Sequence, residues 1–178
     1  WPLRSPWPLD DVYIRNPVGH LNWKSKWIDG APLEADQFSE SMIASRGCPY
    51  AVRACDYCYA AYLGKQYRLR SPADVVDEME SLQQRYDLTY IHFLDDLMMT
   101  DYRWALALCV ELRERKARTG FEVLWGGTCR TNIVADDIIR ARKEGRPHML
   151  EQAYEVGMRQ AAYGVESASP AVLKAIDK

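Results

Sequence analysis

The chain contains the segment Tyr90-Ile91-His92-Phe93-Leu94-Asp95-Asp96, in which five bulky, mostly apolar residues stand directly before two acids. An apolar run without polar alternation is typical of a strand that is covered on both faces, as in parallel sheets. Polar residues at the carboxyl end of such a strand often belong to a functional site. The segment therefore predicts an α/β fold with polar groups at one edge of the sheet, and His92 is expected to be a hydrogen-bonded core residue.

Helix signals lie on both sides of this strand. Upstream, Ser71-Pro72-Ala73-Asp74 supplies an N-cap, a first-turn proline and a capping acid, ahead of an apolar stripe formed by Val75, Val76, Met79 and Leu82. Downstream, Thr100 or Asp101 caps a second predicted helix, which runs to about Ala117 and is closed by Gly120. In this second helix, Glu111 is placed to pair with Arg115.

The alternation of strand and helix continues along the chain. Further strands are predicted over residues 41–45, 121–125 and 160–165, a broken helix runs from Asp136 to Gly157, and Ser169-Pro170 begins another helix. Such repetition implies a parallel sheet. A closed eight-stranded barrel takes about 250 residues, so we expect residues 41–178 to form the N-terminal part of a TIM-like (βα) barrel. Residues 1–40 have no sustained period and are expected to be an irregular lead-in or linker.

Charge and hydropathy narrow the classes of partner. The 178 residues include 23 basic and 25 acidic side chains, for a net charge of -2, which disfavours nucleic-acid binding over the whole surface. The basic run 65–70 is expected to be a solvated loop before a helix. The sequence has no run of about 18 uncharged apolar residues, so no membrane partner is expected. Trp1-Pro2-Leu3-Arg4 lacks the apolar segment of a signal peptide, which predicts a cytoplasmic location.

Three of the five cysteines, Cys48, Cys55 and Cys58, fall within eleven residues. An odd number of cysteines in a chain large enough to build its own core does not fit a secreted disulfide framework. In a reducing compartment, clustered thiolates select zinc, copper(I) or an iron–sulfur cluster. Cys109, in a predicted helix, and Cys129, after a predicted strand, are expected to be core thiols.

The cysteine trio leaves several functions open. A structural zinc needs four protein ligands, and would make the chain a zinc-stabilised, non-catalytic binding module. A [4Fe-4S] cluster with a fourth protein ligand would make it an electron-transfer protein. A cluster held by three cysteines leaves one iron open to another ligand, which is the arrangement that a reaction centre needs. Chance clustering of small buried thiols is the remaining interpretation.

Four segments resemble the radical S-adenosylmethionine (SAM) enzymes over roughly residues 41–178. They are Ser45-Arg46-Gly47-Cys48-Pro49-Tyr50, Cys55-Asp56-Tyr57-Cys58, Phe93-Leu94-Asp95-Asp96 and Tyr163-Gly164-Val165-Glu166-Ser167. The resemblance implies that Cys48, Cys55 and Cys58 hold a [4Fe-4S] cluster whose open iron binds SAM. It further implies an enzyme that cleaves SAM to a 5'-deoxyadenosyl radical, for hydrogen abstraction or methyl transfer on an unknown substrate. Six residues separate Cys48 from Cys55, where the family usually has three.

The same resemblance assigns further cofactor-binding residues. Tyr57 would lie near the adenine of SAM, and Asp95 and Asp96 would receive its amino group. Glu166 and Ser167 would contact its ribose or methionine part. Arg130, which follows Gly126-Gly127, is a candidate for a bidentate pair with the SAM carboxylate, beside the plainer interpretation of a solvated or ion-paired arginine.

The segments look most like the branch of the family that often carries a cobalamin-binding domain upstream. Cobalamin, bound by a domain outside this chain, is therefore an implied additional cofactor. The implied partners are a small-molecule or peptide substrate and an external one-electron reductant such as a flavodoxin or a ferredoxin.

Overall fold

The computed structural model describes residues 39–51, 55, 57, 58 and 66–176. Its main element is a four-stranded sheet in the order β1-β4-β5-β6, in which neighbouring strands are parallel. The strands are β1 (Ser39–Met42), β4 (Tyr90–Phe93), β5 (Leu124–Cys129) and β6 (Met158–Tyr163). The predicted parallel α/β architecture is thus confirmed. The predicted lead-in, residues 1–40, lies outside the described residues except for Ser39 and Glu40.

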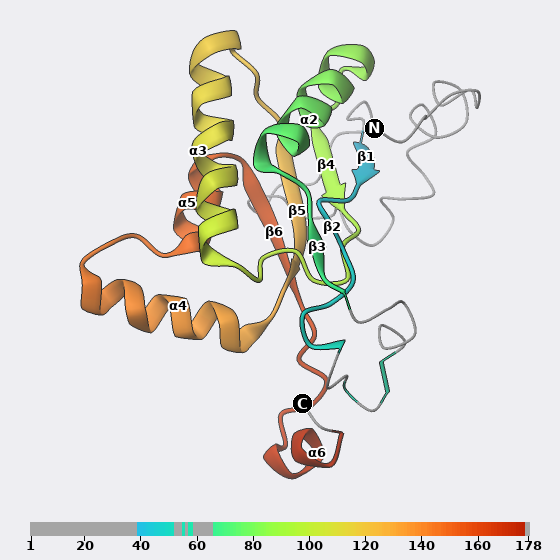
Figure 1. Ribbon diagram of the computed structural model, residues 1–178, viewed down its shortest axis with the longest axis vertical. Helices are drawn as coiled ribbons and strands as arrows, with labels where there is room; N and C mark the ends of the chain where they lie inside the picture. Colours follow the sequence, from blue (N-terminus) through green and yellow to red (C-terminus); the bar gives the residue numbers. More distant parts are fainter. Residues whose placement is uncertain (1–38, 52–54, 56, 59–65, 177–178) are drawn as a thin grey trace.

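Helices follow the strands along the chain. They are α2 (Pro72–Tyr86), α3 (Tyr102–Thr119), α4 (Thr131–Glu144), α5 (Met149–Glu155) and α6 (Pro170–Ala175). In Figure 1, α3 lies between α2 and α5 beside the sheet, and α4 lies across the lower end of α3. The carboxyl ends of β4, β5 and β6 point toward the lower half of the picture. A short antiparallel pair, β2 (Ser45–Arg46) and β3 (Arg68–Leu69), lies at this end of the sheet.

Local capping signals determine the helix ends. The Ser71 hydroxyl oxygen accepts a hydrogen bond from the Asp74 N–H at 3.2 Å, and the Asp101 carboxylate accepts one from the Trp104 N–H at 2.9 Å. Gly120 ends α3 with a left-handed φ of 74°. These predicted caps are confirmed, because each depends only on residues within about one helical turn.

Strand β5 begins three residues later than predicted and contains Gly126 and Gly127. A Cβ at Gly126 would lie 2.1 Å from the Tyr90 hydroxyl oxygen, and one at Gly127 would lie 2.8 Å from the Met98 sulfur. The Tyr90 hydroxyl passes over β5 to donate to the Gln160 side-chain oxygen at 3.1 Å. The two glycines therefore make room for side chains inside β5, although they lie beyond the predicted end of the strand at residue 125.

The other boundary differences are smaller or follow from this one. Helix α4 begins at Thr131, five residues before the predicted start, because β5 ends at Cys129. Strands β1 and β6 each begin two residues before their predicted starts. The glycine near the predicted break, Gly145, ends α4 with a left-handed φ of 63°.

The hydrophobic core lies between the sheet and the helices. All four residues of β4 are buried, including His92 as predicted, and β5 contributes the fully buried Trp125. The Trp125 ring meets the Phe93 ring edge to face at a centroid distance of 5.8 Å, and its Nε1 donates to the Val156 carbonyl at 3.0 Å. Trp125 thus joins the sheet to the turn that follows α5.

Two partly buried ion-pair clusters connect α2 to its surroundings. Arg115 of α3 contacts Asp77 and Glu80 of α2 at 2.5 Å, and Glu111 at 3.3 Å as predicted from their spacing. Arg70, in the run predicted to be a solvated loop, is half-buried and contacts the buried Glu78 at 2.6 Å. That prediction is wrong for residues 68–70, because β3 pairs with β2 and draws Arg70 against α2.

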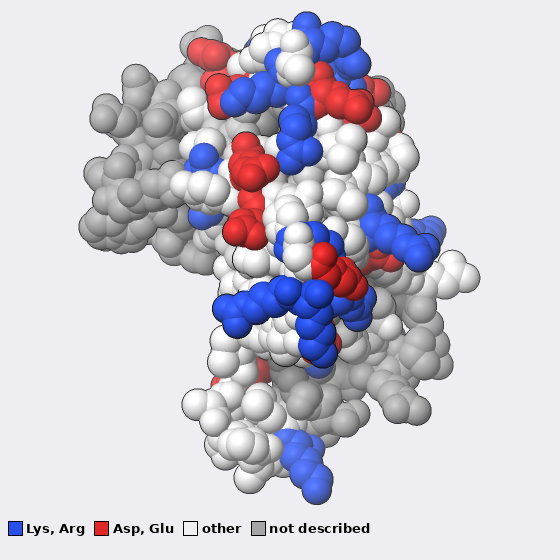
Figure 2. Space-filling model, turned by 90° about the vertical axis from the view of Figure 1, so that its left-hand side faces the viewer, with Lys and Arg blue, Asp and Glu red and all other residues white. Residues whose placement is uncertain are grey.

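The surface charge is mixed. Figure 2 shows acidic and basic side chains interspersed over α3 and α5, with a basic band at the level of α4, which carries Arg140, Arg142 and Lys143. Within the described residues, the helices lack the length and apolar character that crossing a membrane requires.

Candidate functional site

A cavity of about 370 Å³ lies at the carboxyl ends of β4, β5 and β6. Four segments line it: the cysteine segment, the loop after β4, and the ends of β5 and β6. The lining residues are Cys48, Cys55, Tyr57, Cys58, Asp96, Leu97, Thr128, Cys129, Arg130, Ala162, Tyr163, Gly164 and Glu166. Its volume falls within the range of about 300–1,000 Å³ that small-molecule sites usually have.

The three clustered cysteines meet at this cavity, although they are far from β5 and β6 in sequence. All three side chains are half-buried free thiols. Two tight turns hold them, with the Ala51 N–H donating to the Cys48 carbonyl at 2.9 Å and the Cys58 N–H donating to the Cys55 carbonyl at 2.8 Å. Soft sulfur donors in this number fit an iron–sulfur cluster.

The three thiols line the same cavity. Among the residues that the structure describes, no three His, Cys, Asp or Glu side chains are arranged to hold a single metal ion. A structural zinc site requires four ligands at one closed tetrahedral point.

The electrostatic surroundings of Cys48 identify its neighbours in the cavity. Burial raises the pKa of the Cys48 thiol, and a backbone hydrogen bond from Tyr50 lowers it less strongly. Cys58 raises this pKa further, while Arg130 lowers it and Asp96 raises it. Cys58, Asp96 and Arg130 thus lie close enough to Cys48 to influence the charge of its thiol.

Arg130 is held in place at the rim of the cavity. Its guanidinium carbon lies 4.0 Å from the centre of the Tyr50 ring, a cation–π contact, and its Nε donates to the Asn132 side-chain oxygen at 3.0 Å. The Asn132 side-chain nitrogen lies 3.5 Å from the Tyr50 hydroxyl oxygen. Tyr50 and Asn132 thereby fix the orientation of a cation beside the three thiols.

The structure brings most of the predicted site residues together. Tyr57, Asp96, Arg130 and Glu166 line the same cavity as the three cysteines. Glu166 has a left-handed φ of 57°, a conformation that is uncommon outside glycine and is often found at functional sites. These residues come from four separate parts of the chain, and the parallel sheet places them at one edge.

Asp95 and Ser167 lie elsewhere and are not among the described residues that line the cavity. The Asp95 side chain is buried and accepts hydrogen bonds from Ala44 and Ser45. The Ser167 hydroxyl oxygen accepts a hydrogen bond from the Ser169 N–H at 3.1 Å, which stabilises the turn before α6. Their side chains are thus engaged with the protein itself.

Sequence reasoning missed several lining residues, notably Thr128 and Cys129. Cys129 is buried, as expected of a core thiol, and burial raises its pKa to about 12, yet it also borders the cavity. Both residues could have been found from their position, because residues at the carboxyl ends of parallel strands often belong to a functional site. The expected strand ended at residue 125, whereas β5 ends at Cys129, so this rule did not single out Thr128 and Cys129 beside Arg130.

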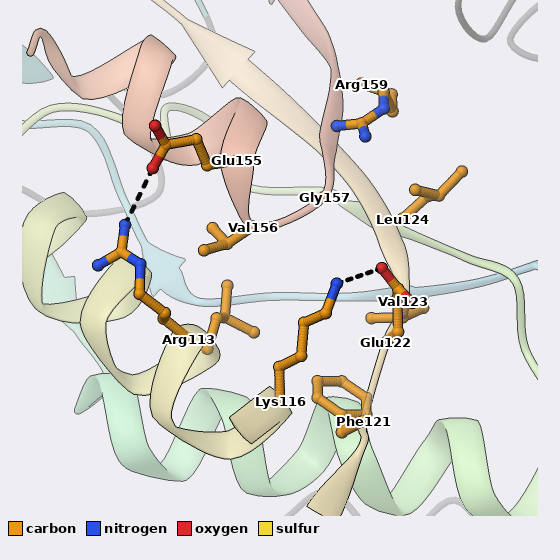
Figure 3. A pocket seen from close by; sticks show the side chains of 11 residues that line it. Arg113, Lys116, Phe121, Glu122, Val123, Leu124, Glu155, Val156, Gly157 and Arg159 are labelled. Carbon is orange, nitrogen blue, oxygen red and sulfur yellow. Dashed lines mark hydrogen bonds and ion pairs between the residues drawn. The ribbon is translucent and has the colours of Figure 1, made fainter. Parts of the chain in front are cut away.

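A second cavity, shown in Figure 3, lies where the end of α3 meets the start of β5 and the turn before β6. It measures about 90 Å³, well below the usual size of a ligand site. Arg113 contacts Glu155 at 3.3 Å and Lys116 contacts Glu122 at 2.5 Å across its rim. Two of its three lining cations are thus paired with acids, and the third, Arg159, lies over the Tyr154 ring. The larger cavity is the stronger candidate for a functional site.

Comparison with known proteins links this arrangement to a family. The chain is 28% identical over 151 residues to an uncharacterized methyltransferase of Pyrococcus horikoshii, covering 84% of this chain and 28% of that protein. It is 28% identical over 134 residues to the hopanoid C-2 methylase of Rhodopseudomonas palustris, covering 75% of this chain and 23% of that protein. The chain therefore spans about a quarter of the length of these relatives.

A solved structure shares the fold. The cobalamin-dependent S-adenosylmethionine radical enzyme OxsB, with aqua-cobalamin bound, superposes with a TM-score of 0.61 at 18% identity, over 76% of this chain and 19% of that one. The sequence model of the Radical SAM superfamily matches residues 42–178, a range that includes the three clustered cysteines and every other residue lining the large cavity. The chain belongs to the Radical SAM superfamily.

Proposed function

We propose that residues 41–178 form the cluster-binding and SAM-binding part of a radical SAM enzyme, with Cys48, Cys55 and Cys58 as the cluster ligands. The observation that carries this proposal is the meeting of three free thiols with Asp96, Arg130 and Glu166 around one cavity. Three cysteines leave one iron of a [4Fe-4S] cluster for a ligand that is not protein. When bound, cluster and SAM together supply one-electron cleavage of SAM to a 5'-deoxyadenosyl radical, for hydrogen abstraction or methyl transfer.

The charges around the cavity match the charges of SAM. SAM carries a carboxylate and an ammonium group on its methionine part, and the described residues that line the cavity include the cation Arg130 and the acids Asp96 and Glu166. A guanidinium binds a carboxylate with strong, charge-assisted hydrogen bonds. Nothing in the described part of the chain accepts a hydrogen bond from the two terminal nitrogens of Arg130, whose Nε is used by Asn132. Arg130 is therefore our candidate for the SAM carboxylate.

The acids and the aromatic residue have complementary roles in this proposal. Asp96 and Glu166 receive the ammonium group and the ribose or methionine part, and Tyr57 packs near the adenine. Tyr57 lines the cavity and is 51% exposed, which supports this role. Apolar groups on the β4 and β6 sides, including Leu97 and Ala162, help to exclude water from the reacting part of SAM.

Replacing Arg130 with alanine is expected to weaken SAM binding without removing the cluster. Hydrogen bonds to a charged group contribute about 1.5–3 kcal/mol, so the SAM dissociation constant should rise about 10- to 100-fold. The measurement is a SAM titration of anaerobically reconstituted protein. Arg140→Ala, on the exposed face of α4, is the matched control and should bind SAM as the wild type does. An Arg130→Ala protein with unchanged SAM affinity would remove Arg130 from the site.

One observation favours a second function. Cys129 borders the same cavity as the cysteine trio, so it is placed to act as a fourth cluster ligand. A fully ligated cluster would make the chain an electron-transfer protein, as the sequence left open. Cys109, by contrast, is buried in α3 and is not among the described residues that line the cavity.

We extend this proposal to the cofactors and partners of the whole protein. The cobalamin-dependent solved relative supports a cobalamin site outside the described residues. A one-electron reductant such as a flavodoxin or a ferredoxin would reduce the cluster, and the substrate would be a small molecule or a peptide. Free thiols throughout fit a reducing compartment, which supports a cytoplasmic location. Residues 1–40 serve as a lead-in or linker to the barrel.

A further inference from the structure

Two neighbouring acids after β4 lie in opposite environments. Asp96 is exposed and lines the large cavity, whereas Asp95 is only 4% exposed. Burying a carboxylate is costly unless it is well hydrogen-bonded. Burial raises the pKa of Asp95, while hydrogen bonds from Ser45 and Ala44 lower it. The Asp95 carboxylate is therefore placed to bind groups of the protein itself, and not a ligand in the cavity.

The two donors to Asp95 belong to the segment that leads to the first cysteine. The Ala44 N–H donates to one carboxylate oxygen at 3.0 Å, and the Ser45 hydroxyl donates to the other. Ser45 lies three residues before Cys48. Asp95 therefore ties the end of β4 to the start of the cysteine segment.

The cysteine segment is fixed at the same place from its other side. Strand β2 pairs with β3, and the Arg70 N–H donates to the Ala44 carbonyl at 2.9 Å. Gly47 has a φ of 86°, and a Cβ there would lie 2.7 Å from the Gln66 carbonyl oxygen. The backbone just before Cys48 is thus held closely against β3, with little freedom to shift.

The backbone of Asp95 also connects to the other side of the cavity. Its carbonyl accepts a hydrogen bond from the Thr128 hydroxyl at 2.9 Å, and the Thr128 carbonyl accepts one from the Met98 N–H at 3.2 Å. Thr128 lines the cavity. Asp95 therefore lies between the cysteine segment and the residues that face the cavity from β4 and β5.

We propose that Asp95 is a positioning residue, whose carboxylate holds Ala44 and Ser45 so that Cys48 takes its place beside Cys55 and Cys58. This inference rests on the proposed function, since it assumes that the three thiols bind one cluster. Asp95 and Asp96 then divide two tasks: Asp95 sets the geometry of the cluster site, and Asp96 faces SAM.

The test compares Asp95→Asn, Ser45→Ala and Asp96→Asn in reconstituted protein, with iron content, the SAM-free electron paramagnetic resonance (EPR) spectrum and the reduction potential as readouts. Groups that orient metal ligands typically change metal affinity about 10- to 100-fold. We expect Asp95→Asn, and less strongly Ser45→Ala, to lower iron occupancy and to alter the spectrum and potential of the cluster that forms. Asp96→Asn should keep the wild-type cluster and lose SAM affinity.

Leu82→Ala is the control that shows whether a general loss of stability, without any loss of positioning, changes the cluster. Leu82 is buried in α2, is not among the described residues that line the cavity, and has no polar role, so this variant should lower the melting temperature without changing the cluster spectrum. If Asp95→Asn fails to fold, Ser45→Ala decides the question, because it removes a single hydroxyl.

Each outcome is decisive. Asp95→Asn and Ser45→Ala proteins with a wild-type cluster spectrum and potential would overturn the role of Asp95, whether or not SAM affinity changes. A wild-type protein that binds no iron would overturn the proposed function and this inference together.

Discussion

Replacing Cys58 with alanine is expected to remove the iron–sulfur cluster and all SAM cleavage. Each of the three cysteines would hold one iron, so the loss of any one of them removes a ligand that the cluster needs. Iron content should fall from about four atoms per chain to a small fraction of that, with loss of the brown colour. Iron and sulfide analysis after anaerobic reconstitution measures this directly, and Cys48→Ala and Cys55→Ala should behave alike.

The matched controls are the two cysteines outside the trio. Cys109→Ala and Cys129→Ala should both keep the cluster and its response to SAM, although each removes a buried thiol. Loss of the cluster in Cys129→Ala would show that a protein side chain fills the fourth corner and would favour the electron-transfer function. A Cys58→Ala protein that retains four irons would refute the ligand assignment.

Replacing Trp125 with alanine is expected to give a large loss of stability. The side chain is fully buried, packs edge to face on Phe93 and donates to the Val156 carbonyl. Large-to-small changes of this kind cost about 3–5 kcal/mol, which is much of the stability of an ordinary domain, about 5–15 kcal/mol. Denaturant unfolding followed by circular dichroism measures the change in the free energy of unfolding.

A Trp125→Phe variant separates packing from hydrogen bonding at this position. It keeps a ring against Phe93 but loses the bond to Val156, and should cost about 1–2 kcal/mol. A loss below about 1 kcal/mol in Trp125→Ala would mean that the core between β5 and the turn after α5 relaxes around the missing ring.

Features governed by nearby residues were predictable from the sequence. The caps at Ser71, Asp101 and Gly120 depend on atoms within one turn, and the structure has all three. The buried strand β4 was equally clear, because its apolar run has no alternation. The short pair β2–β3 was not predicted, since its two-residue strands lie more than twenty residues apart and have no period of their own.

Features governed by distant packing were not predictable. Gly126-Gly127 has the composition of a loop, and only contacts with distant residues, the Tyr90 hydroxyl at Gly126 and the Met98 sulfur at Gly127, explain why glycines lie inside β5. In the candidate site, the close spacing of three cysteines in the sequence was enough to predict that their thiols share one site. Sequence could not tell which of Asp95 and Asp96 faces the cavity, because that depends on how the loop after β4 turns toward Ala44 and Ser45.

The most direct test of the central claim is an EPR and electron–nuclear double resonance measurement of reduced, reconstituted protein with isotope-labelled SAM. If three cysteines hold the cluster and one iron is open, adding SAM should change the cluster spectrum, and the labelled amino or carboxylate group should couple magnetically to the cluster. A cluster spectrum that does not respond to SAM and shows no such coupling would contradict the account.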